Sequence, residues 1–327
     1  MSTKIATLSR RTTLLAGVGI ALGATSGRVF GQEAAEKRAP ENETYWARMG
    51  VSLQGKTVLV TGSTDGLGRE VARQLGALGA FVIVHGRNQE RGEEVVRAIK
   101  AAGAGDAAFH RADLASLSGV AALAETIMET YDRLDVLVNN AAAVSGPERQ
   151  TTADGYELAF AVNYLAHFLL TYRLLPLLEA SAPARIVNVS SMGQTPIDFA
   201  DVMMERTYNP GDAYRRSKLA QIMFTIDLAA ELDARHVTVN SLHPARSMNT
   251  ARVIDGGFQP SSTVEEGAEA TMQLAVSPEL VGRSGLYYNG LNEAKANAQA
   301  YDTAARAKLR ALSFDLTGLA RRPPAFG

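Results

Sequence analysis

The sequence predicts an α/β fold in which helices cover both faces of a doubly wound parallel sheet. Short apolar runs rich in β-branched residues alternate with longer amphipathic stretches along most of the chain. The short runs lack the polar alternation of a half-exposed strand, which indicates strands buried on both faces. Strands and helices that alternate in this way form parallel sheets wrapped by helices. A glycine-rich segment directly follows the first predicted strand.

The predicted elements follow one another at a steady spacing. Strands are predicted over residues 57–60, 81–84, 136–138, 185–189 and 237–242. Helices are predicted over residues 70–78, 91–102, 116–131 and 162–178, and a further helix carries Tyr214 and Lys218. No repeat, low-complexity tract or second linker interrupts this pattern, so we predict a single domain over residues 53–327. A polar, charged linker is predicted before it, over residues 32–52.

Composition and charge exclude several classes of function. The chain has 327 residues with 33 basic and 34 acidic side chains, and its net charge of −1 gives no broad electrostatic footprint for nucleic acid. It has no cysteine, which excludes disulfides, thiolate catalysis and cysteine zinc sites. Its five histidines lack metal-ligand spacing, so we expect core or surface histidines and no metal site.

The first 31 residues resemble an export signal. Arg10 and Arg11 precede an apolar, glycine-rich run over residues 14–22, and no acidic residue occurs before Glu33. The run is too short for a stable helix across a bilayer of about 30 Å. The paired arginines resemble the twin-arginine export motif. We therefore expect a cleaved signal over residues 1–31 and a periplasmic or secreted protein. The alternatives are a cytoplasmic protein and a membrane-tethered one.

The glycine-rich segment after the first strand is suited to a dinucleotide. Its spacing is Gly-x-x-x-Gly-x-Gly, and a helix is predicted directly after it. Glycines let the backbone turn tightly and let a pyrophosphate come close, and the positive end of the helix then holds the phosphates. We predict a Rossmann-type cofactor loop made of Gly62, Ser63, Thr64, Gly66, Leu67 and Gly68.

The end of the second predicted strand favours NADP(H) over NAD(H). Proteins that prefer NAD carry a carboxylate there, which binds the ribose hydroxyls. In this chain the strand ends in His85-Gly86-Arg87-Asn88, with no carboxylate before Glu90. The guanidinium of Arg87 has the geometry to pair with a 2′-phosphate. The alternative is that Arg87 is an ordinary surface arginine.

Tyr214 and Lys218 form a candidate proton-transfer pair. Four residues apart on a helix, they lie on the same face, one turn from each other. An ammonium beside a phenol favours its ionised form and lowers a pKa that is ordinarily about 10. Such a phenol exchanges a proton with an alcohol or carbonyl oxygen. The spacing also arises by chance on solvated helices, so the rest of the sequence has to decide between the two interpretations.

Together the motifs resemble those of the short-chain dehydrogenase/reductase family, from about residue 53 to about residue 319. The matching segments, besides the glycine loop, are Asp113-Leu114, Asn139-Asn140-Ala141, Asn163, Ser190-Ser191, Tyr214 with Lys218, and His243-Pro244. They occur in the order and strand context of that family, which favours the catalytic interpretation of the tyrosine and the lysine. Ala142 and Ala245 stand where the family usually has glycine, which puts the cofactor's pose in question but not the reaction class.

The resemblance implies a role for each matching residue. Tyr214 is implied as the general acid or base, and Lys218 as the residue that tunes it and contacts the nicotinamide ribose. Ser191, the second serine of its pair, is implied to bind the substrate oxygen. Asn163 resembles the asparagine that holds a relay water. The implied cofactor-binding residues beyond the glycine loop and Arg87 are Asp113, Leu114, Asn139, Ala141, Tyr214, Lys218, Pro244 and Thr250.

Further features resemble the retinol-dehydrogenase-like branch of this family. They are residues 197–199, the long gap from Ser191 to Tyr214, and residues 285–288. The branch implies an apolar aldehyde, ketone or alcohol as substrate, and the family implies a homo-oligomer. Residues 192–213 either form part of the substrate wall or serve as plain packing. Two alternatives to carbonyl chemistry remain: a non-catalytic NADP-binding sensor or scaffold, and an enzyme that reduces an activated C=C bond.

Overall fold

One eight-stranded sheet organises the described part of the chain, and its mainly parallel, helix-covered arrangement confirms the predicted fold class. The computed structural model describes residues 44–144, 146–257 and 259–320. The strand order is β3-β2-β1-β4-β5-β6-β7-β8; β8 alone is antiparallel, to β7. The strands are β1 (Thr57–Val60), β2 (Phe81–Gly86), β3 (Asp106–Arg111), β4 (Val136–Asn139), β5 (Ala184–Val189), β6 (Val237–His243), β7 (Tyr287–Asn289) and β8 (Asn292–Ala294).

Helices follow most of the strands and return the chain to the start of the next one. They are α1 (Tyr45–Arg48), α2 (Gly66–Ala77), α3 (Gln89–Ala102), α4 (Leu117–Thr130), α5 (Leu158–Phe160), α6 (Ala166–Ala180), α7 (Pro210–Glu231), α8 (Ala251–Asp255), α9 (Val264–Val276) and α10 (Thr303–Thr317). A π-helical segment, η1 (Ala161–Leu165), joins α5 to α6. Two short 3₁₀ segments are η2 (Pro278–Leu280) and η3 (Ala298–Tyr301).

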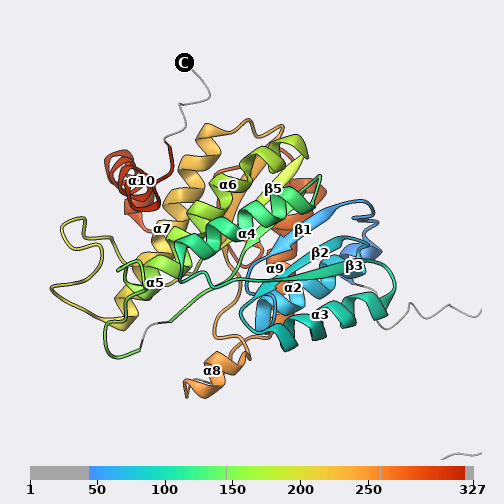
Figure 1. Cartoon of the computed structure of the whole chain (residues 1–327), viewed down its shortest axis with the longest axis horizontal. Coiled ribbons are helices and arrows are strands. Elements are labelled where there is room, and N and C mark those ends of the chain that lie inside the picture. The colour runs from blue at the N-terminus through green and yellow to red at the C-terminus, as the bar shows by residue number, and fades with distance from the viewer. Residues whose placement is uncertain (1–43, 145, 258, 321–327) are drawn as a thin grey trace, which may run out of the picture. The chain divides into compact units, whose positions relative to one another are not determined.

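Each face of the sheet has its own hydrophobic core. Figure 1 shows α4, α6 and α7 over one face, and α2, α3 and α9 belong to the other. Within β1 the side chains alternate: Leu59 belongs to the α4–α6–α7 core, and Val58 and Val60 belong to the α2–α3–α9 core. All three side chains are fully buried, which explains why the predicted strands read as continuous apolar runs.

Strand order reverses beside β1, and this reversal places the candidate site. The chain runs from β1 outward to β2 and β3, then crosses to β4 on the other side of β1 and continues outward. In sheets of this kind the segments that leave the carboxyl ends of β1 and β4 diverge and open a crevice for a ligand. The segments predicted to bind a cofactor leave those ends of the strands.

The helical segment Leu158–Ala180 is long and apolar enough to cross a membrane by length and composition. It spans α5, η1 and α6, and 78% of its apolar window is buried inside the folded unit. It packs against α4 and supplies Phe168, Leu170 and Leu174 to the core on that face. The packing identifies it as the central helix of a globular core.

The predicted division at residue 52 falls inside structured chain. The described residues from 44 onward form one compact unit. Trp46 in α1 is 7% exposed and packs with the α2–α3–α9 core, so residues 44–52 of the predicted linker belong to the packed unit. The predicted signal over residues 1–31 and the rest of the linker lie outside the described residues.

Candidate active site

The glycine loop between β1 and α2 forms a close-fitting backbone turn. Gly62 has a φ of +64°, and a Cβ atom there would lie 2.9 Å from the Cα atom of Ala141. A Cβ atom on Gly68 would overlap the carbonyl oxygen of Gly62. The side chain of Asp65 caps α2, so the positive end of that helix opens onto the loop. This backbone cradle fits a pyrophosphate, because only glycine leaves the required space.

Two buried residues, Ser63 and His85, stabilise the glycine loop through hydrogen bonds. The hydroxyl of Ser63 donates to the Val60 carbonyl (2.8 Å), and the Ser63 N–H donates to the His85 carbonyl (2.9 Å). The N–H of Gly62 donates to Nδ1 of His85 at 3.2 Å. Burial lowers the pKa of His85 to about 4, so its ring is neutral and accepts this bond at neutral pH. Both polar groups of Ser63 are thus committed to the loop, and its predicted contribution to cofactor binding is through loop shape.

An open, strongly basic cleft of about 740 Å³ adjoins the loop at the ends of β2 and β3. Its lining residues are Thr64, Arg87, Asn88, Arg91, Arg111, Ala112 and Asp113. Three arginines therefore face one carboxylate in a cleft beside a phosphate-binding loop. Arg91 is also ion-paired with Asp65, Nη1 to Oδ2, at 3.1 Å. Arg87 and Asp113 were predicted here from the sequence; Arg91 and Arg111 were not, although both lie within five residues of a strand end.

Tyr214 and Lys218 lie together on the first turns of α7. The side chain of Asn209 accepts from the Asp212 N–H at 3.0 Å and caps the helix, and Pro210 occupies its first position. Lys218 is 2% exposed, and its Nζ atom donates to the Val189 carbonyl at 2.8 Å. The same Nζ atom lies 5.7 Å from the centroid of the Tyr214 ring. A buried ammonium beside the phenol favours the ionised form of that phenol.

The two serines that follow β5 have different environments. The Ser190 hydroxyl donates to the Lys218 carbonyl at 2.7 Å, and this serine is 3% exposed. Ser191 is partly exposed, and its hydroxyl oxygen accepts from the Gly193 N–H at 3.0 Å. The Tyr287 hydroxyl donates to the Ser191 carbonyl at 3.1 Å and holds this segment. Ser191 is therefore the serine whose hydroxyl remains accessible to a substrate.

Asn163 lies in the π-helical segment and joins three parts of the site. Its Oδ1 atom accepts from the Ala143 N–H at 2.7 Å, and its Nδ2 atom donates to the Ala143 carbonyl at 3.0 Å and the Ser217 hydroxyl at 2.9 Å. Ser217 in turn donates to the Tyr214 carbonyl at 2.7 Å. Single-turn π segments inside α-helices occur frequently at functional sites. Here Asn163 ties the segment after β4 to the turn of α7 that carries the tyrosine.

The geometry places a glycine cradle, a basic cleft, and a tyrosine, lysine and serine along the carboxyl edge of one parallel sheet. The sequence model of the short chain dehydrogenase family matches residues 56–253, which is more than half of the chain. The chain belongs to the short-chain dehydrogenase family. It is therefore an oxidoreductase whose fold binds a nicotinamide cofactor.

Curated relatives and solved structures agree with this assignment. Human retinol dehydrogenase 14 is 39% identical over 295 residues, which cover 82% of this chain and 88% of that protein. Human retinol dehydrogenase 13 is 38% identical over 290 residues, which cover 82% and 86%. An uncharacterized protein from Mycobacterium paratuberculosis has a TM-score of 0.70 at 30% identity, covering 84% and 97%. Pseudomonas aeruginosa RhlG, solved with NADP, has a TM-score of 0.61 at 28% identity, covering 73% and 95%.

Asn139, Leu67 and Leu114 are among the residues predicted to bind the cofactor of this short-chain dehydrogenase whose side chains are buried. Asn139 is fully buried, and its Nδ2 atom donates to Asn188 at 2.8 Å and to Thr171 at 3.0 Å. Leu67 and Leu114 each belong to one of the two cores. Any contact these three make with a cofactor is through the backbone, because their side chains face the protein interior.

The segment after β6 lies against the glycine loop. The Thr250 Cγ2 atom is 3.3 Å from the position that a Cβ atom of Gly66 would occupy. Pro244 lines a second open cleft, of about 440 Å³, together with Met192, Ala245 and Leu291. This arrangement brings the predicted Pro244 and Thr250 to the same edge of the sheet as Ser191, which directly precedes Met192 in sequence.

Residues 192–213 divide between the two interpretations that the sequence left open. Met192 is 53% exposed and lines the second cleft. Met204 is 3% exposed and packs in a small cluster with Ala159 and Ala213, and Phe199 packs against the α4–α6–α7 core. The segment therefore serves mainly as packing, and Met192 is its contribution to a cleft wall.

Proposed function

We propose that the protein is an NADP(H)-dependent oxidoreductase that interconverts an apolar ketone or aldehyde and its alcohol. Tyr214 is the general acid in reduction and the base in oxidation. The observation that carries this proposal is the buried Lys218 ammonium beside Tyr214. This ammonium binds the carbonyl at the end of β5, two residues before the partly exposed Ser191. A bound nicotinamide supplies or accepts the hydride, and these side chains handle the proton.

Each of the proposed catalytic side chains has a distinct task. Ser191 donates a hydrogen bond to the substrate oxygen and stabilises the negative charge that develops there. Tyr214 transfers the proton to or from the same oxygen. Lys218 stabilises the phenolate through its charge, since it is held in place by the Val189 carbonyl. Asn163 fixes the relative position of these groups through Ala143 and Ser217.

The basic cleft supports NADP(H) as the cofactor. A 2′-phosphate adds about two negative charges beside the adenosine ribose, and guanidinium groups bind such a group bidentately. Arg87, Arg91 and Arg111 line that cleft beside the loop that fits a pyrophosphate. Solved relatives from Pseudomonas aeruginosa and Shigella flexneri were obtained as NADP complexes, which agrees with this proposal.

An apolar substrate is supported by the second cleft and by the relatives. Met192 and Leu291 are 53% and 45% exposed, and both line the second cleft, together with the charged side chains of Arg246, Glu266 and Glu269. The curated relatives are retinol dehydrogenases, named for an apolar alcohol. Exposed apolar side chains at the mouth of a site gain stability when an apolar ligand covers them.

Residues 1–31 are proposed to direct export by the twin-arginine route. The paired Arg10 and Arg11 before a short apolar run support this, and the route suits an enzyme that folds around its nucleotide before leaving the cytoplasm. These residues lie outside the described part of the chain.

The experiment that tests the proposed function is a screen of apolar aldehydes, ketones and alcohols with NADPH and NADP⁺, with product analysis. We expect NADPH oxidation coupled to alcohol formation, and the reverse with NADP⁺. Products saturated at a C=C bond with the carbonyl intact would favour the reductase of activated alkenes. NADPH binding with no turnover on any compound would favour the sensor or scaffold.

A further inference from the structure

The buried Lys218 ammonium has a second protein ligand that the family motifs do not include. Its Nζ atom donates to Oε1 of Gln221 at 2.9 Å, besides the Val189 carbonyl. Gln221 lies one turn further along α7 and is 1% exposed. A buried charge is costly unless hydrogen bonds replace the lost water. Both acceptors are uncharged, so they hold the ammonium without cancelling its positive charge.

A neutral histidine adjoins this amide and connects the site to the cofactor loop. Nδ1 of His167, in α6, lies 3.0 Å from the Asn163 carbonyl oxygen, and its Nε2 atom lies 3.0 Å from the Thr61 hydroxyl. Burial lowers the pKa of His167 to about 3, so the ring is neutral. A carbonyl only accepts, so we assign the hydrogen to Nδ1, and Nε2 accepts from Thr61.

Thr61 completes the connection at the base of the glycine loop. Its hydroxyl oxygen accepts from the N–H groups of Asn140 and Ala141 at 2.9 and 3.0 Å. The Nε2 atom of Gln221 lies 3.5 Å from Nδ1 of His167, so the amide and the imidazole lie in contact. A buried hydrogen-bond network therefore connects the cofactor loop through His167 to Asn163. The ring of His167 also contacts the Gln221 amide, which holds Lys218.

We propose that Gln221 is a positioning residue for proton transfer, whose neutral amide fixes the Lys218 ammonium beside Tyr214 without itself adding a counter-charge. The proposal rests on the proposed function of Tyr214 and Lys218 as the proton-transfer pair. His167 on α6 interacts electrostatically with Lys218, and His85 on β2 interacts in turn with His167. Both histidines are neutral at neutral pH, so neither adds a charge to that of the lysine.

Two substitutions of similar volume separate charge from packing. Gln221→Glu places a carboxylate against the buried ammonium, and the resulting ion pair cancels most of the lysine's field at Tyr214. Gln221→Met keeps the side-chain length but replaces the amide oxygen that accepts from Lys218 by a weakly accepting thioether. The buried position of the ammonium is then less favourable. Thr225→Val is the control for local packing, because Thr225 is buried one turn further along α7. Its hydroxyl accepts from the Asn188 amide and donates to the backbone carbonyl of Gln221, and it does not contact the Gln221 amide that holds Lys218.

The test is an ultraviolet titration of tyrosinate formation in the full chain with NADP⁺ bound. Subtracting the titration of Tyr214→Phe isolates the Tyr214 phenol from the other tyrosines. We expect Gln221→Glu to raise the pH midpoint of Tyr214 ionisation by at least about one unit. Gln221→Met raises it by less, and Thr225→Val leaves it unchanged. Thermal melting with and without NADP⁺ establishes that each variant is folded and binds the cofactor.

The proposal is overturned if Gln221→Glu folds and Tyr214 in it ionises at the wild-type midpoint. If Gln221→Glu does not fold, a wild-type midpoint of Tyr214 ionisation in Gln221→Met overturns it. The failure of the proposed function is distinct, because it appears as full turnover in Tyr214→Phe. If Tyr214→Phe is inactive and the Gln221 variants titrate like wild type, only the assignment of Gln221 is lost.

Discussion

Charge reversal at Arg87 tests the cofactor assignment most sharply. Arg87 lines the basic cleft with Arg91 and Arg111, so Arg87→Glu removes one of three cations and adds an anion where the 2′-phosphate is proposed to lie. A hydrogen bond to a charged group contributes about 1.5–3 kcal/mol, which corresponds to about 10- to 200-fold in Kd. The cleft is open to solvent, so we expect the lower end of that range for the lost contact, with added repulsion from the new carboxylate.

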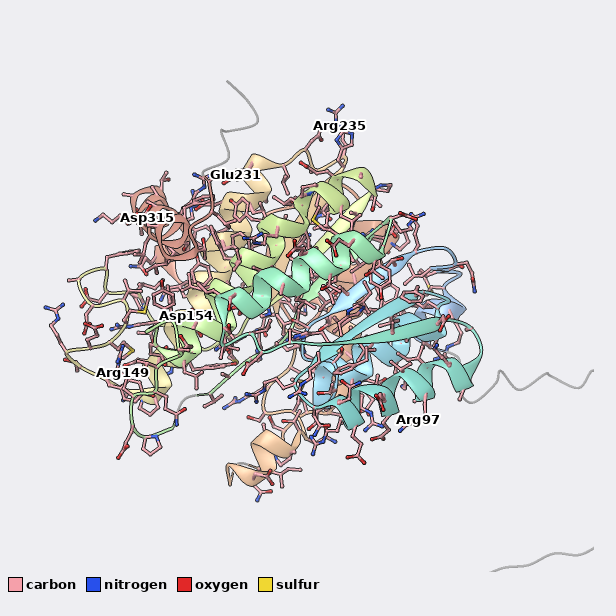
Figure 2. All side chains as sticks on the ribbon, in the orientation of Figure 1. Arg97, Arg149, Asp154, Glu231, Arg235 and Asp315 are labelled. Atoms are coloured by element: carbon pink, nitrogen blue, oxygen red, sulfur yellow. The ribbon has the colours of Figure 1, made fainter. Side chains whose placement is uncertain are left out.

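The assay is the Kd of NADPH and of NADH, measured at low and at high salt. We expect the affinity for NADPH to fall at least about tenfold, with the affinity for NADH nearly unchanged, and the NADPH effect to shrink as salt screens the charges. Arg97→Glu is the matched control: this exposed arginine lies on α3, the helix that begins two residues after Arg87 (Figure 2), and it does not line the cleft. Equal NADPH/NADH ratios in the two variants would refute the argument.

Two further predictions concern the C-terminal helix and the N-terminal segment. Asp227 is paired with Arg306 of α10 at 3.1 Å, yet burial raises its pKa to about 6. A raised pKa gives stability that is complete below about pH 4 and is lost as the pH rises through 6. The free energy of unfolding of Asp227→Asn, relative to that of wild type, should therefore increase as the pH rises from 4.5 to 7.5, as measured by urea unfolding. A decrease over the same range would contradict the assignment. Arg10→Lys with Arg11→Lys should keep the protein in the cytoplasm in cell fractionation, and an unchanged compartment would exclude twin-arginine export.

The interior strands could be predicted because burial on both faces leaves a continuous apolar run in the sequence. β3 lies at the sheet edge and its sequence, residues 106–111, mixes polar and apolar side chains, so it carries no such signal. The hairpin of β7 and β8 has strands of only three residues, and its antiparallel end departs from the predicted parallel pattern. Edge strands are specified by tertiary pairing more than by local sequence.

Motifs in the sequence name candidate site residues, but they do not identify residues that join the site only through tertiary geometry. The glycine loop lies at the carboxyl edge of the sheet because it directly follows β1. Tyr214 and Lys218 lie at the same edge because they are on the first turns of α7, where Lys218 binds the end of β5. No motif identifies Arg111 as a cleft residue, because it becomes one only when β2 and β3 pair. Nor does sequence distinguish side-chain from backbone contact, and the buried amide of Asn139 shows why that matters.

A partly buried ion pair near the far end of α7 shows a similar dependence on tertiary contact. Glu231 lies at the end of that helix (Figure 2). It pairs with Arg310 of α10, Oε1 to Nε, at 2.6 Å, and it also accepts from the Tyr172 hydroxyl at 2.9 Å. The two partners are 79 and 59 residues away from Glu231 in sequence. No local pattern predicts such a cluster, although it fixes α10 on the helix that carries Tyr214 and Lys218.

The central claim is that Tyr214 transfers the proton in a hydride-transfer site that is otherwise complete. Its most direct test is to measure the NADPH affinity and the turnover of Tyr214→Phe on the same preparation. Tyr131→Phe serves as the control, since its hydroxyl contacts His110 at 2.8 Å, beside the edge strand β3. We predict wild-type NADPH affinity with turnover lowered by about 10²- to 10⁴-fold in Tyr214→Phe, and near-wild-type values in the control. Full turnover without the Tyr214 hydroxyl would contradict the account.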